Sequence, residues 1–347
     1  MFQDLPDELV LKILSFSKLK DLTKCGQVSK RIRKISHDGT LWMTVNLEKK
    51  TVTTEFLEMI LRNGCRILKL GDSTILGSLS SNMKSQLRCL NLSQLKGAWS
   101  DQEDPVVEEL ISSSSSLKHL VMEGVYLTPK MAVSICKNGK TLQMLNLNSS
   151  DLDFSSSYPY SSLQEIIKCC QELREVDLNV NNGLNNEDLE FLARNISPNV
   201  EKLNLSKSCF TDDHVKTLLS RCNKIKALTL EATWINVHSL TINKQRLIHT
   251  LEEFSLGPND DSLSSLHSID KDTIIIHRPA ILPQISSIGF LELKSMPKLK
   301  ILNLYYKKDD CNEIQNLRQH LPHLIIKSVL NLLPGTKYNI NLIYKEN

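Results

Sequence analysis

Long apolar runs are absent from the 347-residue sequence. No stretch reaches the roughly eighteen consecutive apolar residues that a membrane-spanning helix needs, so we expect no such helix. The first residues, MFQDLPDEL, carry acidic side chains where a signal peptide would be basic or apolar, which argues against secretion. The nine cysteines form no CxxC pair, so we expect neither a disulfide framework nor a structural zinc site. These features are typical of a protein of the reducing cytoplasm or nucleus.

The net charge is also small, and aromatic side chains make up only 5% of the residues. Lys plus Arg number 42 and Asp plus Glu number 39, and the net charge of +3 is too small to predict nucleic-acid or anionic-membrane binding. No P-loop, GxGxxG or HExxH motif occurs, and His320 and His323 lack an evident third metal ligand. We therefore predict a non-catalytic protein without cofactor or metal. A cysteine-thiolate enzyme is disfavoured, because Cys170 and Cys222 stand at packing positions ahead of the repeated motif described next.

A repeated motif is the main feature of the sequence. The pattern L-x-x-L-x-L, with Cys, Val, Ile, Phe or Met in some Leu positions, recurs along the chain, and repeats of this length indicate a stacked array. The motif begins at Cys65, Leu87, Leu117, Leu142, Leu173, Val200, Ile225, Leu251 and Leu299. Most starts lie 22 to 31 residues apart, and the last gap is 48 residues. We place a degenerate repeat at Thr273–Ile276 within that gap.

Helical patterns separate the motifs, as at Asn186–Leu192 and at Asp212–Leu219, where Thr211 is a candidate N-cap. Each unit is too small to bury its own apolar face, so neighbouring units must stack. The sequence therefore predicts an α/β curved leucine-rich-repeat solenoid of about ten repeats over residues 46–330, with parallel strands on the concave face. Leu41–Leu47 and Leu324–Val329 are expected to cap its ends, and residues 331–347 form a tail. A doubly wound sheet is the alternative, but it would not require this spacing.

The first 45 residues differ from the rest. After Pro6 and two acidic residues, which suit a helix start, the chain is apolar on nearly every side from Leu9 to Phe16. One buried face does not satisfy such a helix, so we expect it to meet another molecule. The alternative is that it only caps the first repeat, but a cap should have a polar outer face.

This segment resembles an F-box, on the residues Leu5-Pro6-x-Glu8-Leu9, Ile13-Leu14, Val28-Ser29-Lys30-Arg31 and Leu41-Trp42. Together with the repeats, the chain is similar to F-box proteins with leucine-rich repeats. The resemblance implies that the box, residues 1–45, docks on a Skp-type adaptor, with Trp42 buried at the junction with the solenoid. The adaptor-binding residues it implies are Leu5, Pro6, Glu8, Leu9, Ile13, Leu14, Leu19, Leu22, Val28 and Ile32. Ile32 stands where the family usually has Trp.

The resemblance also implies a function. F-box proteins of this kind are the non-catalytic substrate receptors of Skp-cullin-F-box ubiquitin ligases, found in the nucleus and cytoplasm. Within the family, this chain looks most like receptors that recruit phosphorylated cell-cycle regulators with help from a small phosphate-binding accessory protein. We expect a protein substrate and no nucleic-acid or membrane partner. The alternative is a scaffold or inhibitor that binds a partner without ubiquitin transfer.

The outward residues of the strand motifs define the candidate binding surface. They are amide-rich and neutral to mildly acidic, and they show no cluster of arginines that would read a phosphate directly. The candidates are Asn146, Asp177, Lys202, Asn204, Glu231, Tyr305, Tyr306, Lys307 and Lys308. We expect Asn204 to point outward and tolerate substitution, and we expect Tyr305–Lys308 to form an aromatic-basic patch for an accessory protein. For that last segment a solvated loop remains the alternative.

Overall fold

The computed structural model describes residues 5–80, 83–97, 105–149, 162–179, 184, 186–208, 210–231, 250–257, 293, 296–305 and 312–329. Its helices and strands, in chain order, are as follows. They are α1 (Asp7–Leu14), α2 (Leu19–Cys25), α3 (Lys30–Ser36), a 3₁₀ turn (Gly39–Leu41), β1 (Thr44–Asn46), β2 (Thr51–Thr53), α4 (Thr54–Arg62), β3 (Ile67–Lys69), β4 (Thr74–Leu76), β5 (Cys89–Asn91), α5 (Pro105–Ser112), β6 (His119–Val121), α6 (Pro129–Cys136), β7 (Met144–Asn146), α7 (Ser162–Cys169), β8 (Glu175–Asp177), α8 (Asn186–Asn195), β9 (Lys202–Asn204), α9 (Asp212–Arg221), β10 (Ala227–Glu231), β11 (Glu253–Gly257), β12 (Ile301–Tyr305), α13 (Asn312–His320) and β13 (Ile325–Val329).

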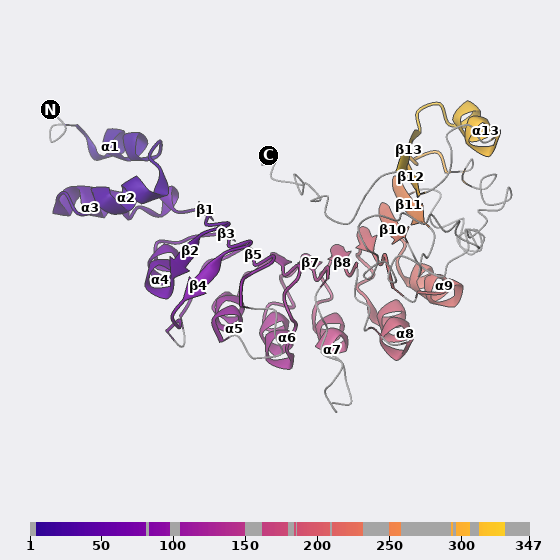
Figure 1. Ribbon diagram of the computed structural model, residues 1–347, viewed down its shortest axis with the longest axis horizontal. Helices are drawn as coiled ribbons and strands as arrows, with labels where there is room; N and C mark the ends of the chain where they lie inside the picture. The colour runs from indigo at the N-terminus through magenta and orange to yellow at the C-terminus, as the bar shows by residue number, and fades with distance from the viewer. Residues whose placement is uncertain are drawn as a thin grey trace, which may run out of the picture.

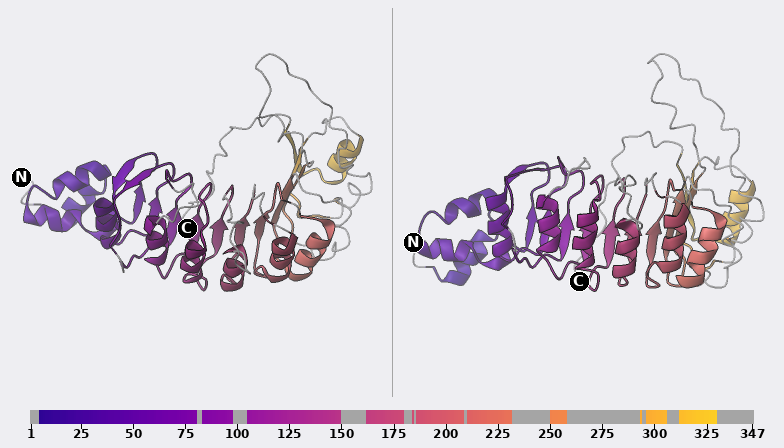
Figure 2. Two further views of the ribbon diagram at one scale, coloured as in Figure 1. Left: turned by 60° about the horizontal axis from the view of Figure 1, so that its bottom comes forward. Right: turned by 90° about the horizontal axis from the view of Figure 1, so that it is seen from below.

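A curved sheet runs through the described part of the chain. Eleven strands lie in the order β1, β3, β5 to β13, and each pairs in parallel with its neighbour. The helices α4 to α9 line the outer, convex side of the arc, while the strands form its inner side (Figure 1). Helices α1 to α3 extend from the β1 end, and the views in Figure 2 show them beyond the first strand. The predicted α/β solenoid is confirmed.

Each of the nine sequence motifs forms one strand of this sheet, from β3 to β12. All three motif leucines point into the core: Leu142, Leu145 and Leu147 are at most 1% exposed in their repeat. Such short strands cannot be stable alone, so the continuous apolar layer between the sheet and the helices holds neighbouring repeats together. The predicted end segments join the same sheet as its edge strands, β1 and β13.

One expectation for the long gap is wrong. Strand β11 pairs directly with β12, with Glu253 opposite Ile301, so the sheet has no place between them for an additional strand. The residues Thr273–Ile276, where the degenerate repeat was expected, lie outside the described part of the chain, as does the tail 331–347.

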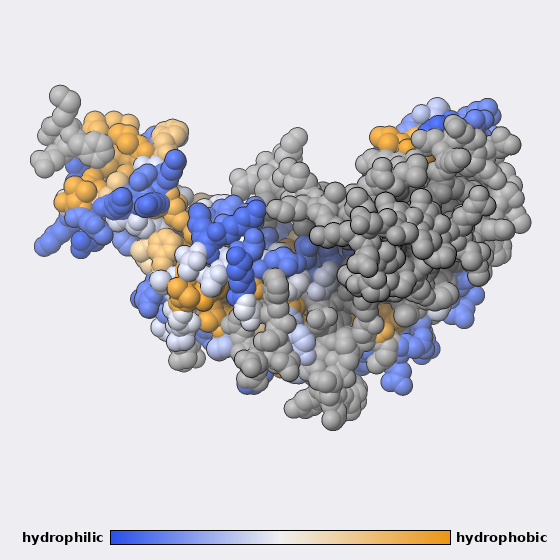
Figure 3. All heavy atoms as spheres, viewed as in Figure 1, coloured by the Kyte–Doolittle hydropathy of each residue, from blue (hydrophilic) through white to orange (hydrophobic). Residues whose placement is uncertain are grey.

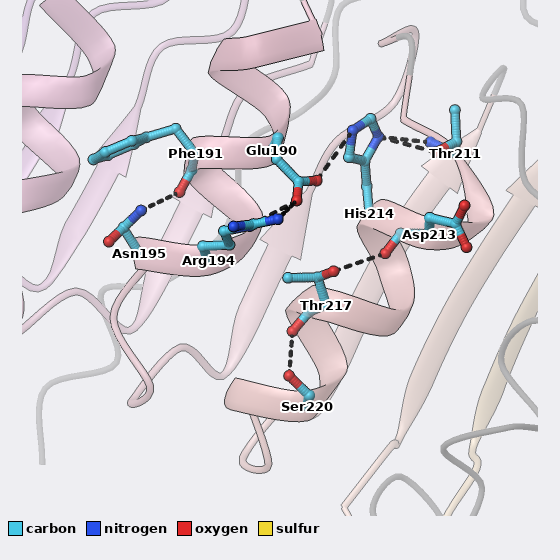
Figure 4. Close-up of polar contacts among 9 residues, drawn as sticks. All are labelled: Glu190, Phe191, Arg194, Asn195, Thr211, Asp213, His214, Thr217 and Ser220. Atoms are coloured by element: carbon cyan, nitrogen blue, oxygen red, sulfur yellow. Dashed lines mark hydrogen bonds and ion pairs between the residues drawn. The ribbon is translucent and has the colours of Figure 1, made fainter.

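The junction between α8 and α9 shows how one repeat is fastened to the next (Figure 4). As predicted, Thr211 is the N-cap of α9, and its backbone N–H donates to Nδ1 of His214 at 3.2 Å. The other ring nitrogen of His214 lies 3.6 Å from a carboxylate oxygen of Glu190 on α8, and His214 is almost fully buried. One side chain thus caps a helix and contacts the preceding repeat, which supports nearest-neighbour stability.

Within the described ranges, no helix combines the length and the apolar character needed to cross a bilayer.

Candidate functional sites on the helices and the concave sheet

The three N-terminal helices form a small bundle joined to the solenoid. Val10 and Leu14 of α1, Leu22 of α2 and Ile35 of α3 are buried and belong to the same apolar core as the first repeats. The guanidinium of Arg31 on α3 forms an ion pair of 2.7 Å with Asp7 at the start of α1. The bundle is therefore held both by a narrow core and by a surface pair.

Trp42 lies between these helices and the first strand of the sheet. It is 1% exposed, and its indole N–H donates to the carbonyl oxygen of Ser36, at the end of α3, at 2.7 Å. A buried indole needs such a partner, because an unpaired N–H in the core is costly. This places Trp42 at the junction of box and solenoid, where Val45 of β1 continues the same core.

Large apolar side chains remain on the surface of the bundle. Leu9 and Ile13 are 51% and 43% exposed and stand four residues apart, on one face of α1. Phe16 follows that helix and Val28 precedes α3, and they are 79% and 77% exposed. The surface view shows apolar side chains gathered over these helices (Figure 3). We call Leu9, Ile13, Phe16 and Val28 the apolar face. Exposed apolar side chains gathered in this way are typical of interaction sites.

The other predicted adaptor-binding residues divide by burial. Leu14 and Leu22 are 3% and 4% exposed, so they fill the bundle's own core and are corrected to packing residues. Leu5, Leu19 and Ile32 are half-buried, whereas Pro6 and Glu8 are exposed. Phe16, just after the end of α1, was missed as a candidate.

On the concave side, the outward residue in the middle of each motif lies opposite its equivalent in the next strand. The continuous row is Asn46, Lys69, Asn91, Val121, Asn146, Asp177, Asn204, Thr229, Ser255, Asn303 and Lys327. Of the candidates, Asn146, Asp177 and Asn204 are neighbours in this row. Lys202 begins β9 two register positions earlier, opposite Glu175. Three of the nine candidates therefore lie side by side at one register position of the sheet.

The amide and acid side chains of the row also have a structural role that the sequence analysis missed. The side-chain oxygen Oδ1 accepts the backbone N–H two residues later, at 2.8 Å for Asn146, 3.0 Å for Asp177 and 3.1 Å for Asn204. Each bond closes a turn where the chain leaves the strand. One residue further, the backbone enters the left-handed region, with φ of 52° at Ser149 and 55° at Lys207. These side chains therefore stabilise the turns that follow the strands, in addition to lining the concave side of the sheet.

Acidic side chains lie in and beside the middle of the row. Burial raises the pKa of the Asp177 carboxyl above its ordinary value, although the Asn179 N–H and the Asn204 amide favour the charged form. Burial, and then the charge of Asp177, raises the pKa of Glu123. Lys202 is engaged with Glu175 at 2.9 Å, so it is not a free cation.

We predict that Asp177→Asn stabilises the protein at neutral pH by up to about 1 kcal/mol. The asparagine keeps the oxygen that accepts the Asn179 N–H and removes a charge that burial disfavours. Because the folded pKa is raised, the cost of the charge is absent at low pH and appears as pH rises through the ordinary value of 3.8. Urea unfolding at several pH values measures it. A variant that is less stable at neutral pH, or equally stabilised at pH 3, would contradict the prediction.

The candidates at the far end are only partly described. Glu231 ends β10 and Tyr305 ends β12, so their backbones border the same side of the sheet. Tyr306, Lys307 and Lys308 lie outside the described residues.

Buried thiols fill the repeats. The side chains of Cys65, Cys170 and Cys222 are fully buried. Burial raises the pKa of Cys65 and Cys170 to about 12 and that of Cys222 to about 11. Such thiols stay protonated near neutral pH and are poor nucleophiles. Across the described residues, His, Cys, Asp and Glu side chains nowhere gather in a group of three or more that could hold a metal ion.

Comparison with known proteins identifies the N-terminal part of the chain. Residues 2–48 match the family model described as F-box-like, so the N-terminal part is an F-box-like domain. Among solved structures, the chain is similar to the leucine-rich-repeat-containing protein LegL7 from Legionella pneumophila, with 14% identity, 82% of this chain and 91% of that chain covered, and a TM-score of 0.46. It is also similar to the leucine-rich-repeat protein LIC12759 from Leptospira interrogans, with 16% identity, coverage of 86% and 92%, and a TM-score of 0.28. The F-box-like domain precedes the solenoid of parallel-strand repeats described above.

Proposed function

We propose that this chain is the non-catalytic substrate receptor of a Skp-cullin-F-box ubiquitin ligase. The observation that carries the proposal is the apolar face on an F-box-like domain, because F-box domains generally bind Skp-type adaptors. The repeats then hold a protein substrate near a ubiquitin-charged enzyme. The contribution of the receptor to the rate is proximity rather than chemistry.

The curved row of polar side chains supports the second half of the proposal. Amide groups on a rigid concave sheet offer donors and acceptors to an extended protein segment. By its motifs the chain resembles the S-phase kinase-associated protein 2 type of receptor, which implies a phosphorylated cell-cycle substrate. We place its action in the nucleus and cytoplasm.

Reconstitution of the ligase tests this function against the alternative of a scaffold or inhibitor. The chain, a Skp-type adaptor, a cullin–RING module and a partner bound to the repeats are combined with ubiquitin and its activating and conjugating enzymes. A substrate receptor yields ubiquitin on the partner, and the yield is lost when the apolar face is mutated. Stable adaptor and partner binding without ubiquitin on the partner would favour the scaffold and contradict the proposal.

We further propose that a small accessory protein reads the phosphate at the Tyr305–Lys308 patch. Tyrosines tend to anchor such interfaces, whereas lysines at the rim mainly alter the association rate. Replacing Tyr305 and Tyr306 with alanine should reduce recruitment of the phosphorylated substrate by at least about tenfold, with adaptor binding unchanged. A pull-down with phosphorylated and unmodified substrate measures this. Unchanged recruitment by the double variant would contradict the patch assignment.

A further inference from the structure

A second row, of charged residues and one glutamine, lies at the N-terminal edge of the sheet, directly before the strands. It consists of the second residue of each motif, namely Arg66, Arg88, Lys118, Gln143, Arg174, Glu201, Lys226, Glu252 and Lys300. We call it the edge row. Neighbouring members are linked through the backbone: the carbonyl oxygen of Arg66 accepts the N–H of Arg88 at 2.8 Å, and that of Arg88 accepts the N–H of Lys118 at 2.8 Å. Their side chains therefore start about one strand spacing apart, roughly 4.8 Å.

The later half of the edge row alternates in charge, with three cations and two acids, and is largely neutralised. Glu201 lies 3.9 Å from Arg174 and 2.5 Å from Lys226. Glu252 lies 2.5 Å from Lys300. These contacts lower the pKa of Glu201 through the Lys226 ammonium and that of Glu252 through the Lys300 ammonium, so both acids are ionised at neutral pH. This half presents little net charge to a partner.

The first half places three cations in succession. Arg88 and Lys118 are exposed and Arg66 is half-buried. No ion pair recorded among the described residues involves any of the three. Like charges on adjacent strands repel and destabilise a sheet. The same sheet therefore has an unneutralised positive edge over β3, β5 and β6, and neutralised charge over β9 to β12.

We propose that Arg66, Arg88 and Lys118 bind an acidic, Asp/Glu-rich segment of the protein substrate. The three cations span about 10 Å, and an extended peptide spaces alternate side chains by about 6.6 Å, so two or three alternating carboxylates match that length. Arginine offers two parallel N–H donors to each carboxylate. The proposal rests on the proposed role of the repeats as a substrate-binding surface, and it adds a carboxylate-binding site apart from the Tyr305–Lys308 patch.

The test uses the 347-residue chain and a fluorescein-labelled decapeptide of alternating glutamate and serine, whose binding is measured by fluorescence anisotropy. Arg88→Gln combined with Lys118→Gln should weaken binding by at least about tenfold. Lys226→Gln combined with Lys300→Gln is the matched control, because it removes the same charge at the same row from the neutralised half. The control should change the affinity by less than about twofold, and wild-type binding should weaken as salt is added.

A second measurement distinguishes the proposed site from general attraction to a positively charged surface. Arg88→Glu inserts an acid between two cations, as Glu201 stands between Arg174 and Lys226. It should abolish peptide binding and raise the melting temperature by about 1–3 °C. A lowered melting temperature would show that the three cations do not repel one another, which would remove the basis of the proposal.

Other occupants of the edge row give results that overturn the proposal. Equal loss of binding in both double variants means general attraction to a cationic protein. Binding of a glutamine–phosphoserine decapeptide, but not of the glutamate–serine decapeptide, means a phosphate site. Equal binding of single-stranded DNA means a nonspecific polyanion site. Loss of adaptor binding in Arg88→Gln/Lys118→Gln would place the row in the adaptor interface. If the proposed ligase role is wrong, the wild-type chain will not bind the adaptor. The peptide measurement contains no adaptor, so the two failures can be told apart.

Discussion

Replacing Leu9 and Ile13 together with alanine should weaken binding to a Skp-type adaptor by roughly a hundredfold or more. Both side chains belong to the apolar face and are about half exposed in the free chain, so they are available to anchor a partner. Truncating such an anchor typically costs about 2 kcal/mol or more of binding free energy, and each 1.4 kcal/mol is about tenfold. Isothermal titration calorimetry with the purified adaptor measures the change.

The matched control is Val133→Ala. Val133 is 53% exposed on α6 of the solenoid, close to the exposure of Leu9, but it lies outside the F-box-like domain. It should leave adaptor affinity unchanged, and circular dichroism should show both variants folded. Unaltered adaptor affinity in the Leu9/Ile13 variant, or an equal loss in the control, would contradict the assignment of the apolar face.

Leu203→Ala should destabilise the protein by about 2–5 kcal/mol, the usual cost of a cavity left by a buried leucine. Leu203 is 2% exposed, and it lies between Val176 of the preceding strand and Leu228 of the following strand. Because repeats are stabilised by their neighbours, the damage should spread to the adjacent repeats. Urea unfolding, with hydrogen exchange to locate the loosened repeats, measures both effects.

Asn204→Ala serves as the neighbouring control. The sequence predicted almost no cost, but Asn204 accepts the backbone N–H of buried Ser206 at 3.1 Å, so we now expect a loss of about 1 kcal/mol. The leucine variant should remain clearly the more damaging of the two. The opposite order would mean that the strand register is shifted by one residue.

The repeats were predictable because their spacing and alternation are physical requirements of stacking. A motif such as Leu142–Leu147 must place its leucines inward to bury them, which fixes both the strand and its outward residues. The cap at Thr211 was likewise visible in the sequence, since a hydroxyl before a helical pattern satisfies a free N–H. The pairing of His214 with Glu190 was not, because it joins residues that only stacking brings together.

The sequence indicated which segments carry the candidate sites, but not which of their side chains are exposed. Apolar periodicity indicated an interaction helix, yet it could not separate Leu14, which packs inward, from Ile13 beside it, which remains exposed. The cationic edge was missed because Arg66, Arg88 and Lys118 lie 22 and 30 residues apart in the sequence. Only the register of the parallel strands makes them neighbours.

Hydrogen–deuterium exchange of the full chain with and without a Skp-type adaptor tests the central claim most directly. The account predicts that adaptor binding slows exchange within residues 5–36, in the helices that carry the apolar face, and leaves strands β6 to β9 unchanged. Protection centred on those strands, or no protection of α1 at saturating adaptor, would contradict the division of the chain into an adaptor-binding box and a separate substrate-binding solenoid.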